Sequence, residues 1–88
     1  MKFMLSFTMN PAQFKAAVSR FLETGARPPD GVKMLGRWHG SAKGWVLAEA
    51  HDPKKLYEWT ARWSDLLEFT VVPVLEDAEL GEVLGKLQ

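Results

Sequence analysis

Two apolar periodicities alternate along this chain of 88 residues, and their order leaves few possible folds. The first segment, residues 2–9, places an apolar side chain at every second position, which is the period of a strand with one buried face. Asn10-Pro11 then predicts a helix start, because Asn can cap free backbone N–H groups and proline fits the first turn. The apolar stripe of this helix consists of Phe14, Ala17, Val18, Phe21 and Leu22, and Gly25 is expected to end it as a left-handed cap.

A hairpin and a second helix follow. Residues 32–39 and 45–50 have the length and composition of strands, and Gly40-Ser41-Ala42-Lys43-Gly44 between them predicts a five-residue turn. Asp52-Pro53 repeats the cap-then-proline start, so we expect a second helix that turns its apolar side chains inward. Those side chains are Leu56, Trp59, Trp63 and Leu67.

The C-terminal part of the chain predicts an edge strand and a short helix. Residues 68–75 are predicted as the fourth strand, and because Pro73 within it lacks the N–H group that a central ladder requires, this is an edge strand or one bulged at that point. Asp77 is expected to cap the last helix, whose apolar stripe is Leu80, Val83, Leu84 and Leu87. Gly81 and Gly85 weaken this helix by about 1 kcal/mol each relative to Ala, so we expect it to need a surface to dock on.

The resulting order, strand–helix–strand–strand–helix–strand, is that of the ferredoxin-like fold. Right-handed crossovers place both helices on one face of a four-stranded antiparallel sheet and leave the other face open. We therefore predict one α+β domain over residues 1–88, with a ferredoxin-like βαββαβ core and a short C-terminal helix. A chain of this length buries a small core, so pairing with a second copy would add stability.

The hairpin register predicts which side chains reach the open face. With a five-residue turn, His39 lies opposite Trp45, and the open face carries Lys33, Leu35, Arg37, His39, Trp45, Leu47, Glu49 and His51, with Met4, Ser6 and Thr8 of the first strand. Val32, Met34, Gly36 and Trp38 would then lie under the helices with Val46, Ala48 and Ala50. A slip of one residue would exchange the two sets. A face that mixes apolar and polar groups suits a dimer interface or a pocket closed by one.

Composition excludes several classes of protein. The chain has 11 basic and 11 acidic residues, so it lacks the surplus of positive charge that nucleic-acid binding requires. It has no cysteine, which excludes disulfides and thiolate chemistry and fits a reducing compartment. No stretch approaches the roughly 20 apolar residues of a membrane helix. We expect a cytoplasmic protein with no membrane partner and no cofactor.

His39 and Arg37 are the predicted catalytic residues. The imidazole of His39 can act as a general base near neutral pH, and the planar guanidinium of Arg37 can hold a carboxylate or a phenolate. In the structural alternative, His39 packs against Trp45 and Arg37 forms a cross-strand ion pair with Glu49. His51 lies at the opposite end of the predicted hairpin from His39, so no metal site is expected.

The predicted ligand-binding residues share the open face and are Arg37, His39, Trp45, Glu49 and Ser6. Among the tryptophans, Trp45 is the one expected to line a cavity. Trp59 and Trp63 recur at helical spacing, which is typical of core residues.

Several blocks of the sequence resemble a family of small bacterial proteins known only as a domain of unknown function. The blocks are Phe21-Leu22-Glu23-Thr24-Gly25, Gly31, Gly36-Arg37-Trp38-His39, Leu56-Tyr57-Glu58-Trp59 and Trp63-Ser64-Asp65-Leu66-Leu67-Glu68-Phe69. The family is similar in fold to the dimeric α/β-barrel proteins, and the resemblance implies a homodimer in which two open sheet faces meet. It implies no activity, because relatives in the wider superfamily differ widely in function.

Three hypotheses for function follow. The first is a homodimer that binds a small organic molecule between the helices or between the paired sheets, near Arg37, His39, Trp45 and Glu49. The second is a cofactor-free enzyme, monooxygenase-like or isomerase-like, with His39 as base and Arg37 holding the developing anion. The third is a structural or regulatory dimer without a pocket. A solvent-connected cavity lined by His39 and Arg37 would favour the first two, and neutralisation of Arg37 by Glu49 would favour the third.

Overall fold

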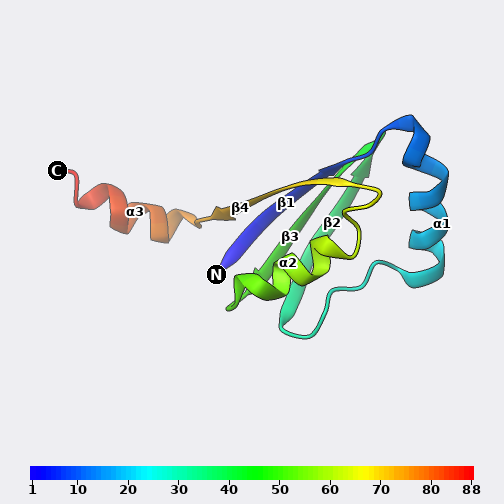
Figure 1. Cartoon of the computed structure of the whole chain (residues 1–88). Coiled ribbons are helices and arrows are strands. Elements are labelled where there is room, and N and C mark those ends of the chain that lie inside the picture. Colours follow the sequence, from blue (N-terminus) through cyan, green and yellow to red (C-terminus); the bar gives the residue numbers. More distant parts are fainter.

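The computed structural model describes residues 1–88 and contains one four-stranded antiparallel sheet with three α-helices (Figure 1). The strands are β1 (Lys2–Thr8), β2 (Val32–Gly40), β3 (Lys43–Ala50) and β4 (Glu68–Val74). The helices are α1 (Phe14–Thr24), α2 (Pro53–Ala61) and α3 (Asp77–Gly85), with a 3-10 turn η1 (Pro11–Gln13) before α1. The strand order β2-β3-β1-β4 is that of the ferredoxin-like fold, which confirms the predicted architecture.

Both predicted proline-containing helix starts are present. The side chain of Asn10 accepts a hydrogen bond from the backbone N–H of Gln13 at 3.2 Å, and the Asp52 side chain accepts one from Lys54 at 2.9 Å. The Asn10 cap begins η1, and α1 continues from it. Gly25 ends α1 with φ at 72°, the left-handed conformation in which glycine carries no Cβ penalty.

The cap of α3 differs from the prediction by one residue. Glu76, not Asp77, is the N-cap, because its side chain and that of Glu79 form a reciprocal capping box with the backbone. Asp77 is the first helical residue, where its negative charge still interacts favourably with the helix dipole. In addition, Lys2 Nζ lies 2.7 Å from Glu76 Oε1, and this hydrogen bond raises the pKa of Lys2.

The contiguous core lies between the sheet and α2 and contains no residue of α1, in which Ala17 alone is buried. The contiguous buried cluster consists of Phe3, Leu5, Val32, Val46, Ala48, Ala50, Leu56 and Trp59. Both α1 and α2 lie on one side of the sheet, but α1 stands farther from the strands, as Figure 1 shows. Side chains of α1, α2 and the sheet line a space between these elements, and this space is the setting of the candidate site.

The hairpin differs from its predicted register in two ways. First, the pairing of β2 with β3 extends to Gly40 and Lys43, so the turn contains two residues, Ser41 and Ala42, rather than five. Second, Met34 lies opposite Ala48 while Gly36 lies opposite Leu47, so Leu35 is an extra residue that forms a β-bulge. Together these changes place the β2 side chains after the bulge on the faces opposite to those predicted.

The consequences are opposite for the two halves of β2. Before the bulge, Val32 and Met34 face the helices as predicted, and Val32 belongs to the core. After it, Trp38 lies opposite Trp45 on the open face, whereas Arg37 and His39 lie opposite Val46 and Gly44 on the helix-facing side. The predicted assignment of Gly36, Arg37, Trp38 and His39 was therefore wrong, because one bulged residue exchanges every later side chain between faces.

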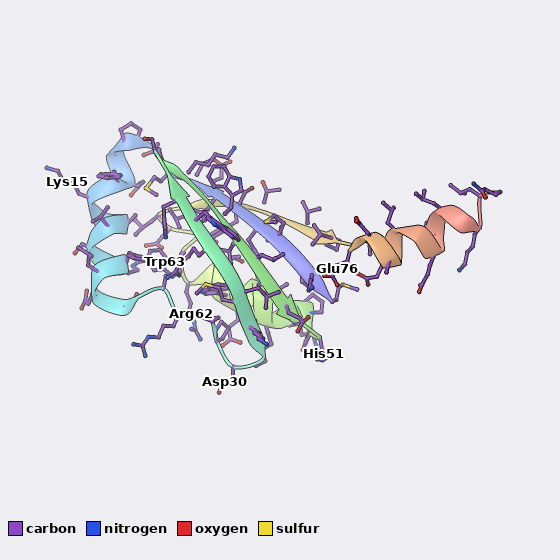
Figure 2. All side chains as sticks on the ribbon, turned by 180° about the vertical axis from the view of Figure 1, so that it is seen from behind. Lys15, Asp30, His51, Arg62, Trp63 and Glu76 are labelled. Carbon is purple, nitrogen blue, oxygen red and sulfur yellow. The ribbon has the colours of Figure 1, made fainter.

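The two ends of the molecule are formed by α1 and α3. The edge position of β4 is confirmed, and Pro73 lies in it opposite Phe3. Beyond β4, α3 extends away from the sheet, and the molecule measures 51 × 27 × 18 Å (Figures 1 and 2). The apolar side chains of α3 are left exposed and are Leu80, Val83, Leu84 and Leu87. None of the helices is both long and apolar enough to cross a membrane.

Gly44 provides a test of the packing between β1 and β3. It lies opposite Phe7, and a Cβ atom added at residue 44 would overlap the Phe7 ring. We expect Gly44→Ala to lower the free energy of unfolding by about 1–3 kcal/mol, measured by urea denaturation, because the ring must leave its position. Gly81→Ala in α3 is the control, since a Cβ there meets nothing within 4 Å. Equal stability of the two variants would contradict the packing described.

Candidate functional site

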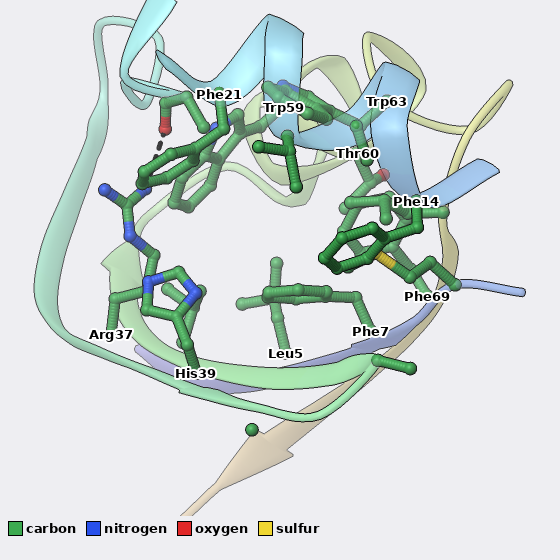
Figure 3. A pocket seen from close by; sticks show the side chains of 18 of the residues that line it. Leu5, Phe7, Phe14, Phe21, Arg37, His39, Trp59, Thr60, Trp63 and Phe69 are labelled. Carbon is green, nitrogen blue, oxygen red and sulfur yellow. Dashed lines mark hydrogen bonds between the residues drawn. The ribbon is translucent and has the colours of Figure 1, made fainter. Parts of the chain in front are cut away.

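A cavity of about 300 Å³ lies between α1, the end of α2 and the helix-facing side of the sheet (Figure 3). Its walls are mainly hydrophobic, and 15 of the 19 residues that line it are apolar, so the space favours an apolar occupant over water. The aromatic residues of the lining are Phe7, Phe14, Phe21, Trp59, Trp63 and Phe69. Phe7 and Phe14 approach the space from opposite sides, from the sheet and from α1.

Three polar side chains line the cavity, namely Arg37, His39 and Thr60. The hydroxyl of Thr60 donates a hydrogen bond to the backbone carbonyl of Tyr57 at 3.2 Å, so its donor is already used within α2. Arg37 and His39 are separated by one residue on β2 and lie together on one wall (Figure 3). The polar character of the cavity is therefore concentrated at these two residues.

The guanidinium of Arg37 is held by backbone groups and not by a carboxylate. Its Nη1 donates to the carbonyl oxygen of Ala26 at 3.1 Å, and its Nη2 donates to that of Gly25 at 3.3 Å. The Cζ atom lies 4.9 Å from the centre of the Phe21 ring, a cation–π distance. Burial lowers the pKa of Arg37, as expected where water is partly excluded from a charge. The ion pair between Arg37 and Glu49, offered as the structural alternative, is absent because the two residues lie on opposite faces.

His39 lies beside aromatic rings at the edge of the cavity. Its ring centre is 5.5 Å from that of Phe21 and 6.4 Å from that of Phe7, both in edge-to-face arrangements. The predicted packing against Trp45 is not found, because Trp45 lies on the other face. No side-chain hydrogen bond of the structure involves the imidazole, so both ring nitrogens are free to contact an occupant.

The remaining predicted site residues lie away from the cavity. Trp45, Glu49 and Ser6 are on the open face, where Trp45 forms a shallow hollow with Met4 and Trp38. His51 is exposed just after β3 (Figure 2). The five predicted ligand-binding residues are therefore divided between two faces, and the structure brings together only Arg37 and His39. No group of three or more His, Asp or Glu side chains is arranged to hold a metal ion.

A second arginine attaches α1 to the segment after α2. Arg20 donates two hydrogen bonds to the Asp65 carboxylate, Nη1 to Oδ1 at 2.8 Å and Nη2 to Oδ2 at 2.7 Å. Its Nη1 also donates to the carbonyl of Arg62 at 3.0 Å, and its Cζ lies 5.3 Å from the centre of the Trp63 ring. These hydrogen bonds lower the pKa of Asp65. Arg20 thus holds the middle of α1 over the cavity, and Arg37 holds its C-terminal end.

The sequence alone did not identify most of the cavity. Phe14, Phe21, Trp59 and Trp63 were predicted as ordinary inward-facing helix residues, and periodicity cannot distinguish a core side chain from one that lines a void. The Arg20–Asp65 contact joins residues 45 positions apart, and no local signal in the sequence connects them.

Comparison with known proteins adds a family but no activity. A family model described as "Domain of unknown function (DUF3303)" matches residues 1–88, in agreement with the resemblance noted above. No curated protein matches the chain. Among solved structures, the chain is similar to MupZ from Pseudomonas fluorescens, with 19% identity over 98% of this chain and 82% of MupZ and a TM-score of 0.43.

The Arg20–Asp65 contact predicts a pH-dependent contribution to stability. Because the pKa of Asp65 is lowered in the folded state, the contribution is present above the ordinary aspartate pKa of 3.8 and is lost as the pH falls through the lowered value. We expect Asp65→Asn to be less stable than the wild type in urea denaturation at about pH 7, and the difference to shrink toward about pH 3. A difference that stays constant over this range would contradict the role assigned to the contact.

Proposed function

The chain belongs to the DUF3303 family, and we propose that it binds a small, largely apolar organic molecule in the cavity between α1 and the sheet. The observation that carries this proposal is the cavity itself, a space of about 300 Å³ with aromatic walls and a polar end at Arg37 and His39. A small-molecule site is commonly a mostly apolar concave space with a few convergent polar groups, and this one lies at the lower end of the usual size range.

The packing of α1 supports a binding role. A helix that merely completed a core would bury its apolar stripe against the sheet, but Phe14 is 50% exposed and Leu22 is 78% exposed. Arg20 and Arg37 instead hold α1 through polar contacts at its side and its end. Apolar surface left in contact with water lowers stability, so an occupant that covers it would bind favourably.

The residues that line the cavity favour a binding function over a catalytic one. His39 can still act as a base on a bound substrate, which keeps the enzyme hypothesis consistent with the geometry. However, the lining contains no carboxylate, tyrosine or lysine to act as a second acid–base group, and the hydroxyl of Thr60 is bonded to the backbone. Binding requires only the groups that are present, so it is the function we assign.

We also propose that the protein forms a homodimer through its open sheet face. This face carries Trp38, 55% exposed, and Val72, 48% exposed, beside the less exposed Trp45 and Met4. The apolar stripe of α3 is uncovered on the same chain. A second copy offers a matching surface for the open face, because a two-fold interface pairs one patch with itself.

Two neighbouring alanines of α1 provide a matched test of the cavity. Ala17 is 4% exposed and lines the cavity, whereas Ala16 is exposed and lies outside it. The probe is 6-propionyl-2-(dimethylamino)naphthalene, a neutral two-ring aromatic compound whose fluorescence rises in apolar surroundings. We expect Ala17→Leu to weaken its binding about tenfold or more, because the added side chain occupies the space, while Ala16→Leu binds it like the wild type.

The same titration defines the outcomes that would contradict the proposal. Circular dichroism of both variants establishes that each is folded. If the wild type shows no saturable binding of the probe, the cavity is not a binding site for this class of compound. If Ala16→Leu and Ala17→Leu weaken binding equally, the probe occupies another surface.

The dimer is tested by mass. At micromolar concentration, light scattering should give twice the mass of the 9.9 kDa chain. Trp45→Glu should shift the protein toward the monomer, because a charge on the open face would be buried in the interface. Tyr57→Glu is the control, since Tyr57 lies on α2, 73% exposed and away from that face. A monomer mass for the wild type would refute the proposal.

A further inference from the structure

The cavity contains a positive charge for which the protein supplies no counterion. The ion pairs of the structure are Lys2–Glu76, Arg20–Asp65, Lys55–Glu58 and Arg62–Glu58, and none involves Arg37. No carboxylate occurs among the residues that line the cavity. The two carbonyl groups that Arg37 contacts are dipoles, so they orient the guanidinium without cancelling its unit charge.

The guanidinium also retains unused donors. It has five N–H groups, and the structure gives hydrogen bonds from one N–H of each terminal nitrogen, to Ala26 and Gly25. A planar guanidinium matches a carboxylate geometrically, and its charge strengthens the resulting hydrogen bonds. His39, on the same wall, offers an imidazole without a hydrogen-bond partner, which can donate to the same anion.

The rest of the cavity limits the body of the ligand. An apolar cavity of about 150 Å³ holds one benzene molecule, so a space of about 300 Å³ fits roughly two rings or an aliphatic group of similar size. The walls around this space are the rings of Phe7, Phe14, Phe21, Trp59 and Trp63. Faces and edges of such rings favour a flat aromatic body.

We infer that the ligand is a small organic carboxylate, with its anionic group at Arg37 and His39 and an aromatic body among the phenylalanine and tryptophan side chains. This inference rests on the proposed function and adds the chemical class of the molecule. The charge of the ligand is the distinguishing property, because Arg37 would bind a carboxylate more tightly than a neutral compound of the same shape, whereas the apolar walls would contact both alike.

The test compares 2-naphthoate with 2-naphthamide, a neutral compound of nearly the same shape, by isothermal titration calorimetry. We expect the wild type to bind 2-naphthoate about ten- to a hundredfold more tightly than 2-naphthamide, the range of a charge-assisted hydrogen bond. Arg37→Gln should bind 2-naphthamide within about threefold of the wild type but lose the preference for the carboxylate. Lys43→Gln removes one positive charge on the open face and should keep the preference.

A second measurement needs no variant at position 37. In the wild type, 2-naphthoate should shift the NMR signal of the Arg37 Nε–H group, and 2-naphthamide should shift it much less. The NMR measurement still tests the inference if Arg37→Gln releases α1 and unfolds the protein.

The outcomes separate the two proposals. Equal affinity for both compounds, or an Arg37 signal unmoved by bound 2-naphthoate, overturns the carboxylate inference and leaves the cavity as a binding site. Absence of binding by both compounds overturns the inference together with the proposed function. A preference that persists in Arg37→Gln moves the anion away from Arg37 and also overturns the inference.

Discussion

One extra residue in β2 decides the chemistry of the cavity. Leu35 has no partner in β3, and every side chain of β2 that follows it is turned to the opposite face. Arg37 and His39 therefore point toward the helices, and Trp38 takes its place beside Trp45 on the open face. The bulge thus allows Val32 and Met34 before it, and Arg37 and His39 after it, to face the helices together.

The cavity persists because polar contacts hold α1 in place of close packing. Arg20 joins the helix to Asp65, and Arg37 joins its C-terminal end to the sheet through the carbonyls of Gly25 and Ala26. An exposed contact such as Arg20–Asp65 contributes little stability by itself, but directional bonds define position well. A helix held in this way can leave a space beneath it that a helix held by apolar packing would close.

The two proposed functions use separate faces of the sheet. The helix-facing side carries the cavity, with a cation at one end and aromatic rings around it. The open face carries an apolar surface with tryptophans at its centre, and α3 adds a second uncovered apolar stripe. Binding of a small molecule and pairing of two chains can therefore occur together, since neither uses the surface of the other.

The sequence by itself determined the order of elements, the caps at Asn10 and Asp52, the left-handed Gly25 and the edge position of β4. These features depend on local chemistry: the period of apolar residues, side-chain oxygens beside free N–H groups, a glycine and a proline. It also indicated Arg37 and His39 as candidate site residues, although it placed them on one face with Trp45, Glu49 and Ser6. Only the tertiary structure decided which face Arg37 and His39 occupy, because residues 40–44 allow a turn of two or of five residues. A shift of the strand register by one residue moves every side chain to the other face. The Arg20–Asp65 contact and the void beneath α1 likewise exist only once distant segments meet, so no local pattern could have revealed them.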